Sequence, residues 1–290
     1  MSNRMYPENS MSAGNLEPSV RLDEALRLAR AGQYAEALAE YLWCFDHGAE
    51  AQPDFGATRL SLLLAYLQEL STAYPPAAEA MESRRDAVEA AALAGTADQA
   101  ALETMVALNK RLYSPLRLLN VFEQLGEGGP AQRKTRKQLL PLMLDVLVDR
   151  QQYQVILDNT GDIVADAGRA IGAYLSLADR VAAEEEHLGP SARLALHRRN
   201  ALDKVGNYYE AALGVKLEPQ AGQIADRLLA AVPNDYGSYL VLAGRAMKLH
   251  RIEIARTLLE RGLEHVPETD QAQLRAALAS LGPDERGASG

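Results

Sequence analysis

The fold is decided by one stretch near the N-terminus, Ala31-Gly32-Gln33-Tyr34-Ala35-Glu36-Ala37-Leu38-Ala39-Glu40-Tyr41-Leu42-Trp43-Cys44. A glycine that can turn the chain is followed by an aromatic residue, and then by small and large residues at alternating three- and four-residue steps. This spacing predicts a helix that presents one repeating face. Its small residues allow a paired helix to approach closely, and its large residues fill the groove between neighbours. The stretch therefore predicts a tight pair of helices.

A second stretch near the C-terminus is more complete, because it shows both helices of such a pair. It reads Tyr239-x-x-Leu242-Ala243-x-x-Ala246, continues to Ala255-x-x-x-Leu259, and ends at Pro267. Both stretches resemble the tetratricopeptide repeat, although Ala243 stands where that family favours glycine and Leu259 where it favours an aromatic residue. The pattern is well formed at residues 18–48 and 236–267, whereas residues 54–125 depart from it in spacing and length.

The resemblance implies an all-α solenoid of antiparallel helix pairs, a right-handed superhelix that is irregular in the middle of the chain. Its concave groove would bind a peptide or a helix of another protein, and such stacked repeats rarely host catalysis. One subclass of the family holds acidic C-terminal tails with lysine and asparagine on the first helices. The matching inward positions are filled here by Leu22, Leu26, Leu240 and Gly244, which argues against that subclass.

The remaining chain also reads as helical. Leucines recur at helical steps from Leu60 to Leu70, and no stretch alternates apolar and polar residues as a strand does. Short turns divide the chain into about a dozen helices. Two weaker resemblances to the repeat conflict in register. Residues 221–233 have the spacing of the second helix of a repeat, whereas residues 206–211 resemble the turn that precedes such a helix. Only one of these two interpretations can be right.

Composition shifts and turn residues also predict the domain organisation. We expect a disordered segment over residues 1–17, an N-terminal helical domain over 18–125, a glycine-rich linker over 126–130, a C-terminal helical domain over 131–281 that ends in a cap helix, and a disordered tail over 282–290.

Bulk properties exclude several function classes. The 290 residues are 48% apolar, which suffices for a sizeable core, and the net charge of −9 disfavours binding to nucleic acid. The lone Cys44 excludes an intramolecular disulfide and a multi-cysteine metal site. Neither a secretory signal nor an apolar run long enough to span a membrane is visible, so we expect a cytoplasmic protein without a membrane partner.

Residues 184–187, Glu-Glu-Glu-His, form the one tight cluster of carboxylates and histidine in the sequence. Glu184 and His187 have the spacing that places two metal ligands on one helix face. No second Glu-x-x-His completes a di-metal site, and a charge run beside a Gly-Pro stop is usually solvated. We therefore expect no metal, no cofactor and no catalytic residue.

Two groups of residues are candidate contacts for a partner. Trp43 either packs under the next helix, around Tyr66, or is exposed as an anchor, with His47 one turn further along the same helix. The basic run from Arg133 to Lys137 is a solubilising helix start, or else it meets an acidic partner or an RNA backbone. The candidate binding residues are Trp43, His47, Tyr66, Arg133, Lys134, Arg136 and Lys137.

The functional prediction is a non-enzymatic scaffold that binds a peptide or helix of another protein in its groove. The alternative is an all-α enzyme or ligand-binding bundle with a site between the two helical halves. The sequence does not identify the partner.

Overall fold

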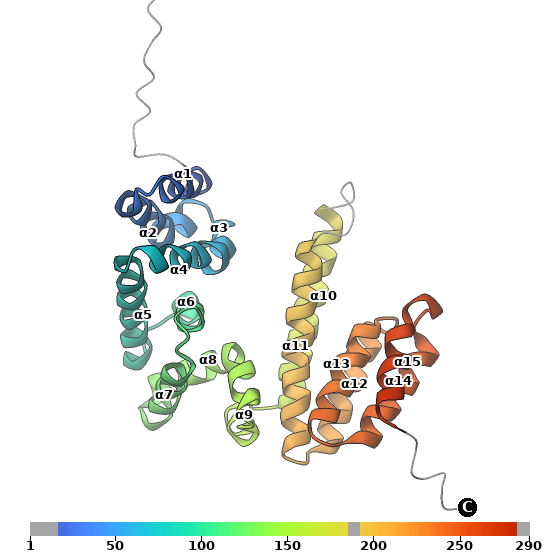
Figure 1. Ribbon diagram of the computed structural model, residues 1–290. Helices are drawn as coiled ribbons and strands as arrows, with labels where there is room; N and C mark the ends of the chain where they lie inside the picture. The colour runs from blue at the N-terminus through green and yellow to red at the C-terminus, as the bar shows by residue number, and fades with distance from the viewer. Residues whose placement is uncertain (1–16, 185–191, 283–290) are drawn as a thin grey trace, which may run out of the picture. The chain divides into compact units, whose positions relative to one another are not determined.

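The computed structural model describes residues 17–184 and 192–282, and every regular element within these ranges is a helix (Figure 1). The prediction of an all-α protein is confirmed. None of the helices in the described residues is both long and apolar enough to cross a membrane. The predicted disordered ends, residues 1–17 and 282–290, lie outside the described ranges except for Glu17 and Gly282.

The chain forms two compact units that divide between Gln138 and Leu139, inside α8 (Pro130–Asp149). The predicted glycine-rich linker spans residues 126–130. Of these, only Gly128 and Gly129 lie between the preceding helix and α8.

The N-terminal unit is a chain of helices in which sequence neighbours pack on one another, α1 on α2, α4 on α5, and α5 on both α6 and α7. Its elements are α1 (Pro18–Arg30), α2 (Tyr34–Ala51), α3 (Phe55–Thr58), the π-helix η1 (Arg59–Leu63), α4 (Leu64–Ala73), α5 (Pro76–Ala94), α6 (Gln99–Arg111) and α7 (Pro115–Glu127).

The α1–α2 pair is as tight as the small residues predict. Ala25 on α1 and Ala37 and Cys44 on α2 are completely buried. The Cys44 thiol donates a hydrogen bond to the Pro18 carbonyl oxygen at 3.5 Å, so the sulfur lies against the first turn of α1. A larger side chain at any of these positions would push the two helices apart.

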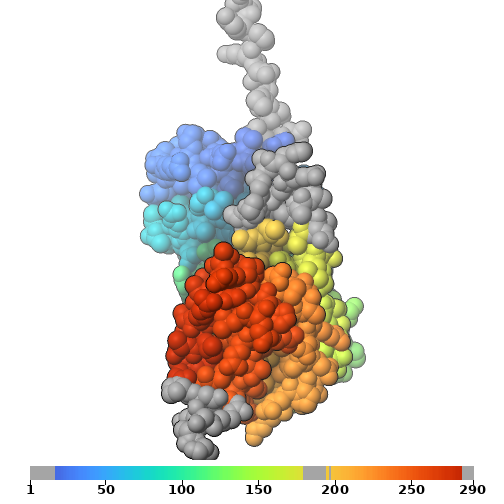
Figure 2. All heavy atoms as spheres, turned by 90° about the vertical axis from the view of Figure 1, so that its right-hand side faces the viewer, coloured from blue at the N-terminus to red at the C-terminus, as the bar shows by residue number. Residues whose placement is uncertain are grey.

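The C-terminal unit contains two long helices followed by a row of shorter ones (Figure 1), and its last helices, orange to red, face the viewer in Figure 2. Its elements are α9 (Tyr153–Asn159), α10 (Ile163–Glu184), α11 (Ala192–Gly214), α12 (Glu218–Ala231), α13 (Tyr236–Lys248), α14 (Ile252–His265), the 3-10 turn η2 (Glu268–Asp270) and α15 (Ala272–Ser280). The helix α11 packs on α9, α10, α12 and α13, and α13 packs on α14 and α15.

One three-residue turn recurs at five places in the described residues. Its middle residue has a left-handed backbone, and the amide of its third residue donates to the carbonyl oxygen five residues earlier at 2.8–3.0 Å. This hydrogen bond ends the first helix as a Schellman motif and lets the second begin at once. The middle residues are Gly32, Tyr113, Gln151, Lys216 and His250.

Two of these turns, at Lys216 and His250, are 34 residues apart, so α11–α12 and α13–α14 are equivalent pairs. Five residues after each turn stands a buried alanine, Ala221 or Ala255, at most 1% exposed. The chain leaves each pair through a proline, Pro233 or Pro267.

The positions of these turns decide between the two conflicting interpretations of residues 206–211 and 221–233. Residues 221–233 include most of the second helix α12, as one interpretation predicts. The turn predicted at 206–211 is wrong, because these residues lie inside α11. Gly206 is there for packing, since a Cβ on it would lie 2.8 Å from a methyl group of Val241 on α13.

Candidate functional site

The C-terminal unit has a pocket of about 670 Å³ at the level where α13 begins, a volume within the range of small-molecule sites. It lies between the long α10–α11 hairpin, the α12–α13 turn and η2. Its lining residues are Tyr174, Leu194, Ala195, Arg198, Val232, Pro233, Asn234, Asp235, Tyr236 and Asp270.

The lengths of the helices create this pocket. The helices α10 and α11 have 22 and 23 residues, whereas α12, α13 and α14 have only 13 or 14. An ion pair between Arg198 on α11 and Asp235 fixes the level at which α13 begins. Residues 175–184 and 192–197 therefore continue past the shorter helices by roughly 9–15 Å at 1.5 Å per residue. We call these two segments the overhang (Figure 1).

Asp235 holds the floor of the pocket in place. Its carboxylate accepts hydrogen bonds from the Gly237 amide at 3.2 Å and from the Ser238 amide at 3.1 Å, which caps the N-terminus of α13. The Ser238 hydroxyl donates to the same carboxylate at 2.5 Å, and Arg198 pairs with it. Both oxygens of Asp235 are thus used by the protein itself.

Aromatic and apolar side chains form much of the remaining wall. Tyr174 on α10 and Tyr236 on α13 are half-buried, and Leu194 and Val232 are partly exposed beside them. Tyrosine and arginine are the side chains most often found where binding energy is concentrated in protein interfaces. Sequence reasoning missed this pocket, because the signal for it was the mismatch in helix length and not any motif.

Trp43, the first predicted contact, lies at the surface of the α1–α2 core and is half-buried. The Arg21 guanidinium lies 3.9 Å from the centre of its ring, in cation–π contact, and also pairs with Glu40 at 3.0 Å. The exposed His47 has its ring centroid 5.7 Å from that of Trp43. Trp43 is therefore both a packing residue and partly accessible.

Tyr66 lies elsewhere in the same core. Its ring stacks on that of Tyr41, with the centroids 6.2 Å apart, and it is half-buried. Burial raises the pKa of Tyr41 to about 12, and Tyr66 and Glu69 add to the rise. Tyr41 is therefore neutral at every physiological pH, and the pair acts as packing.

The basic run at the start of α8 is divided between two roles. Arg136 packs its guanidinium 4.5 Å from the ring centre of Phe122 on α7, and its Nε is buried. Arg133 donates to the Gly128 carbonyl oxygen at 2.5 Å, which closes the turn between α7 and α8. Lys134 and Lys137 are exposed. Two of the four cations are thus engaged in holding α7 against α8.

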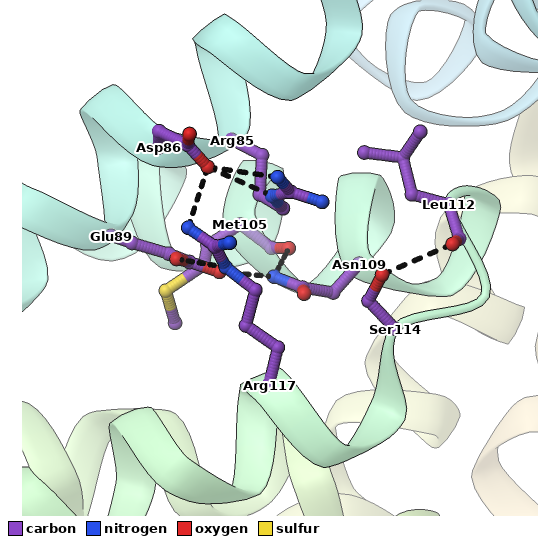
Figure 3. A network of polar contacts seen from close by, with 8 residues as sticks. All are labelled: Arg85, Asp86, Glu89, Met105, Asn109, Leu112, Ser114 and Arg117. Atoms are coloured by element: carbon purple, nitrogen blue, oxygen red, sulfur yellow. Dashed lines mark hydrogen bonds and ion pairs between the residues drawn. The ribbon is translucent and has the colours of Figure 1, made fainter. Parts of the chain in front are cut away.

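A cluster of ionisable groups joins α5, α6 and α7 in the N-terminal unit, and no sequence motif predicts it (Figure 3). Glu89, buried on α5, accepts from Asn109 Nδ2 at 3.0 Å and from Arg117 Nε at 2.6 Å. Arg117 and Arg85 both reach the Asp86 carboxylate, at 2.6 and 2.9 Å. Both carboxylates are paired, so the cluster ties three helices together and leaves neither of them free as a base.

A second buried network joins α9, α11 and α13 in the C-terminal unit. Glu210 is completely buried and accepts from the Tyr153 hydroxyl at 2.9 Å. Arg245 and Lys248 on α13 each reach it at 2.8 Å. Burial and the bond to Glu210 raise the pKa of Tyr153, which keeps its hydroxyl a donor. The network links α9, α11 and α13, and it shares no residue with the lining of the pocket.

The carboxylate–histidine run at 184–187 lies outside the described residues apart from the backbone of Glu184. Within residues 17–184 and 192–282, no three histidine, cysteine or acidic side chains come together as metal ligands would. The Cys44 thiol is completely buried, and burial raises its pKa to about 11, so it is unreactive at neutral pH.

No protein-family model and no curated protein matches the chain.

Proposed function

We propose that this protein is a non-enzymatic scaffold of tetratricopeptide-like helix pairs that binds a segment of another protein. The observation that carries the proposal is the pocket beneath the overhang, which lies beside two helix pairs in a 34-residue register. Stacked pairs of this kind present continuous surfaces to partners.

The packing of the pairs supports this solenoid interpretation. The first helices α11 and α13 contact each other, and α13 contacts α15, so the first helices form one row. Gly262 on the second helix α14 leaves room for two neighbours, since a Cβ on it would lie 3.0 Å from both Tyr239 on α13 and Leu274 on α15. The Tyr239 hydroxyl donates to the Pro233 carbonyl oxygen at 3.1 Å, which ties one pair to the end of the pair before it.

The use of the ionisable groups favours binding over catalysis. A general base must reach a substrate proton with a free oxygen or nitrogen. Glu89 and Glu210 are instead committed to arginine, lysine, asparagine and tyrosine partners within the fold. The pocket residues Asp235 and Arg198 are likewise committed to each other.

Quantitative affinity capture from the cells that produce the protein tests the proposal. The bait is the full chain, compared with the double variant Tyr174→Ala/Tyr236→Ala and with Tyr113→Ala, which removes a tyrosine that is 81% exposed in the other unit. We expect a set of proteins that the wild type and Tyr113→Ala retain and the pocket variant loses, at unchanged helical content. Identical sets for all three baits would refute the pocket as the binding site.

A further inference from the structure

The charges on the described residues that line the pocket beneath the overhang do not balance. Arg198 and Asp235 neutralise each other in their ion pair. The second carboxylate in the lining, Asp270 of η2, is exposed and accepts only a long hydrogen bond, 3.4 Å, from the Thr269 hydroxyl among the described residues. Among the described lining residues, Asp270 is therefore a negative charge that no cation balances, and it faces solvent.

Among the described residues of the pocket, the amides and the arginine that could bind an anion are already paired with Asp235. Backbone amides at a helix N-terminus and an arginine are the usual ligands of a carboxylate or phosphate. The Gly237 and Ser238 amides at the start of α13 are bound to Asp235, and so is Arg198. An anion in the pocket would have to displace Asp235 from its cap.

A guanidinium group, in contrast, matches what remains. Tyr174 and Tyr236 contribute aromatic side chains to the lining of the pocket, and a guanidinium can stack on such rings while it pairs with a carboxylate. Leu194, Val232 and Pro233 offer apolar surface for the methylene groups of the side chain. The net charge of −9 on the whole chain would draw a basic segment toward it.

We infer that the pocket receives an arginine side chain on a basic, exposed segment of the partner protein, with Asp270 as its counter-ion. This inference rests on the proposed function and names the partner's chemistry. Tyr174, Leu194 and the α12–α13 turn provide walls of the site, and Asp235 and Arg198 form its floor.

Fluorescence anisotropy with three matched peptides tests the inference on the full chain. Each peptide is labelled with fluorescein and has the same polar sequence around a Leu-X-Leu centre, where X is arginine, its neutral isostere citrulline, or glutamate. The protein variants are Asp270→Asn, Tyr236→Leu and the control Asp203→Asn, which removes an exposed carboxylate on α11 outside the pocket.

We expect the arginine peptide to bind with a dissociation constant of about 10⁻⁴ M, and the citrulline and glutamate peptides at least about fivefold more weakly. Asp270→Asn should weaken the arginine peptide about fivefold and leave the citrulline peptide unchanged. Tyr236→Leu should weaken both, and Asp203→Asn neither.

Two results would overturn the inference while leaving the proposed function intact. One is a glutamate peptide that binds as tightly as the arginine peptide. The other is an Asp203→Asn variant that loses as much affinity as Asp270→Asn, since the attraction would then come from overall charge. The inference also fails if none of the three peptides binds the wild type at millimolar concentration. In that case, the affinity capture with the wild type and the Tyr174→Ala/Tyr236→Ala variant still tests the proposed function.

Discussion

Replacing Glu210 with alanine should unfold the C-terminal unit more easily and leave the N-terminal unit unchanged. The carboxylate is completely buried and accepts from Tyr153, Arg245 and Lys248 at 2.8–2.9 Å. Removing one partner of a buried ion pair costs about 3–5 kcal/mol, because the remaining charge stays desolvated. The side chains of Arg245 and Lys248 are 22% and 38% exposed, so water can reach them in part. We therefore expect about 3 kcal/mol for Glu210→Ala, which is about 6–12 °C in Tm for a unit of this size.

Two milder variants grade the effect. Glu210→Gln keeps the shape and one acceptor oxygen but loses the charge, so it should cost about 1–2 kcal/mol. Tyr153→Phe removes one donor and leaves Glu210 with two cations, for about 1 kcal/mol. The control is Glu218→Ala, where a carboxylate that is 55% exposed pairs with Arg251 at 3.6 Å, and its cost should stay below about 0.5 kcal/mol.

The lone tryptophan makes the assay specific to one unit. Trp43 lies in the N-terminal unit, so its fluorescence follows that unit, whereas circular dichroism follows both. Urea unfolding of the Glu210 variants should shift the circular dichroism transition and leave the Trp43 transition where it is. A Glu210→Ala protein as stable as Glu218→Ala would refute the buried network, and an equal shift in both signals would refute independent unfolding of the two units.

Three further predictions use other parts of the fold. Gly206→Ala should destabilise the C-terminal unit by about 1–2 kcal/mol in urea unfolding, because the new methyl group would lie 2.8 Å from Val241. Gly244 has open space around it, so Gly244→Ala should stabilise that unit by up to about 1 kcal/mol. A change of the same sign in both variants would contradict the close approach of α11 and α13. Cys44 should resist thiol reagents at pH 8 and react only when the protein unfolds. Because burial raises the pKa of its thiol from 9.0 to about 11, its contribution to stability is complete below pH 9 and is lost as the pH rises through 11. Rapid labelling of the folded protein at pH 8 would disprove its burial. Trp43→Ala should lower the stability of the N-terminal unit by about 2 kcal/mol, because the variant lacks the contacts of the indole ring with the core and with Arg21. Thermal melting measures this loss, and an unchanged melting curve would identify Trp43 as a free surface anchor.

The helices near the two ends of the chain could be predicted because residue types and spacing in the sequence mark their turns and packed positions. Gly32 marks the first helix-pair turn by its residue type, and Ala25 and Ala37 lie on the packed faces of the two helices. The equivalent turns at Tyr113 and Lys216 carry residues that favour no left-handed conformation, and the sequence indicates them only through the prolines that follow, Pro115 and Pro219. Gly206 looks like a turn signal, yet it serves a close contact between helices.

The candidate site was beyond sequence reasoning for a different reason. The pocket depends on where α13 begins relative to α11, and that level depends on the packing of the two helices and on the pairing of Arg198 with Asp235, 37 positions later in the chain. Likewise, Glu210 finds Tyr153 and Arg245 through tertiary packing that no local pattern encodes. Of the predicted contact residues, Trp43 keeps an accessible face, and Arg136 is taken up by packing on Phe122.

The central claim is that the C-terminal unit holds a segment of another protein in the pocket beneath the overhang. Photo-crosslinking from within the pocket tests it most directly, with benzoylphenylalanine placed at Tyr236 or, as a control in the other unit, at the exposed Tyr113. The account predicts discrete protein adducts from Tyr236 that disappear when Tyr174 is also replaced by alanine, and no such adducts from Tyr113. Adducts from Tyr113 alone, with none from Tyr236, would contradict it.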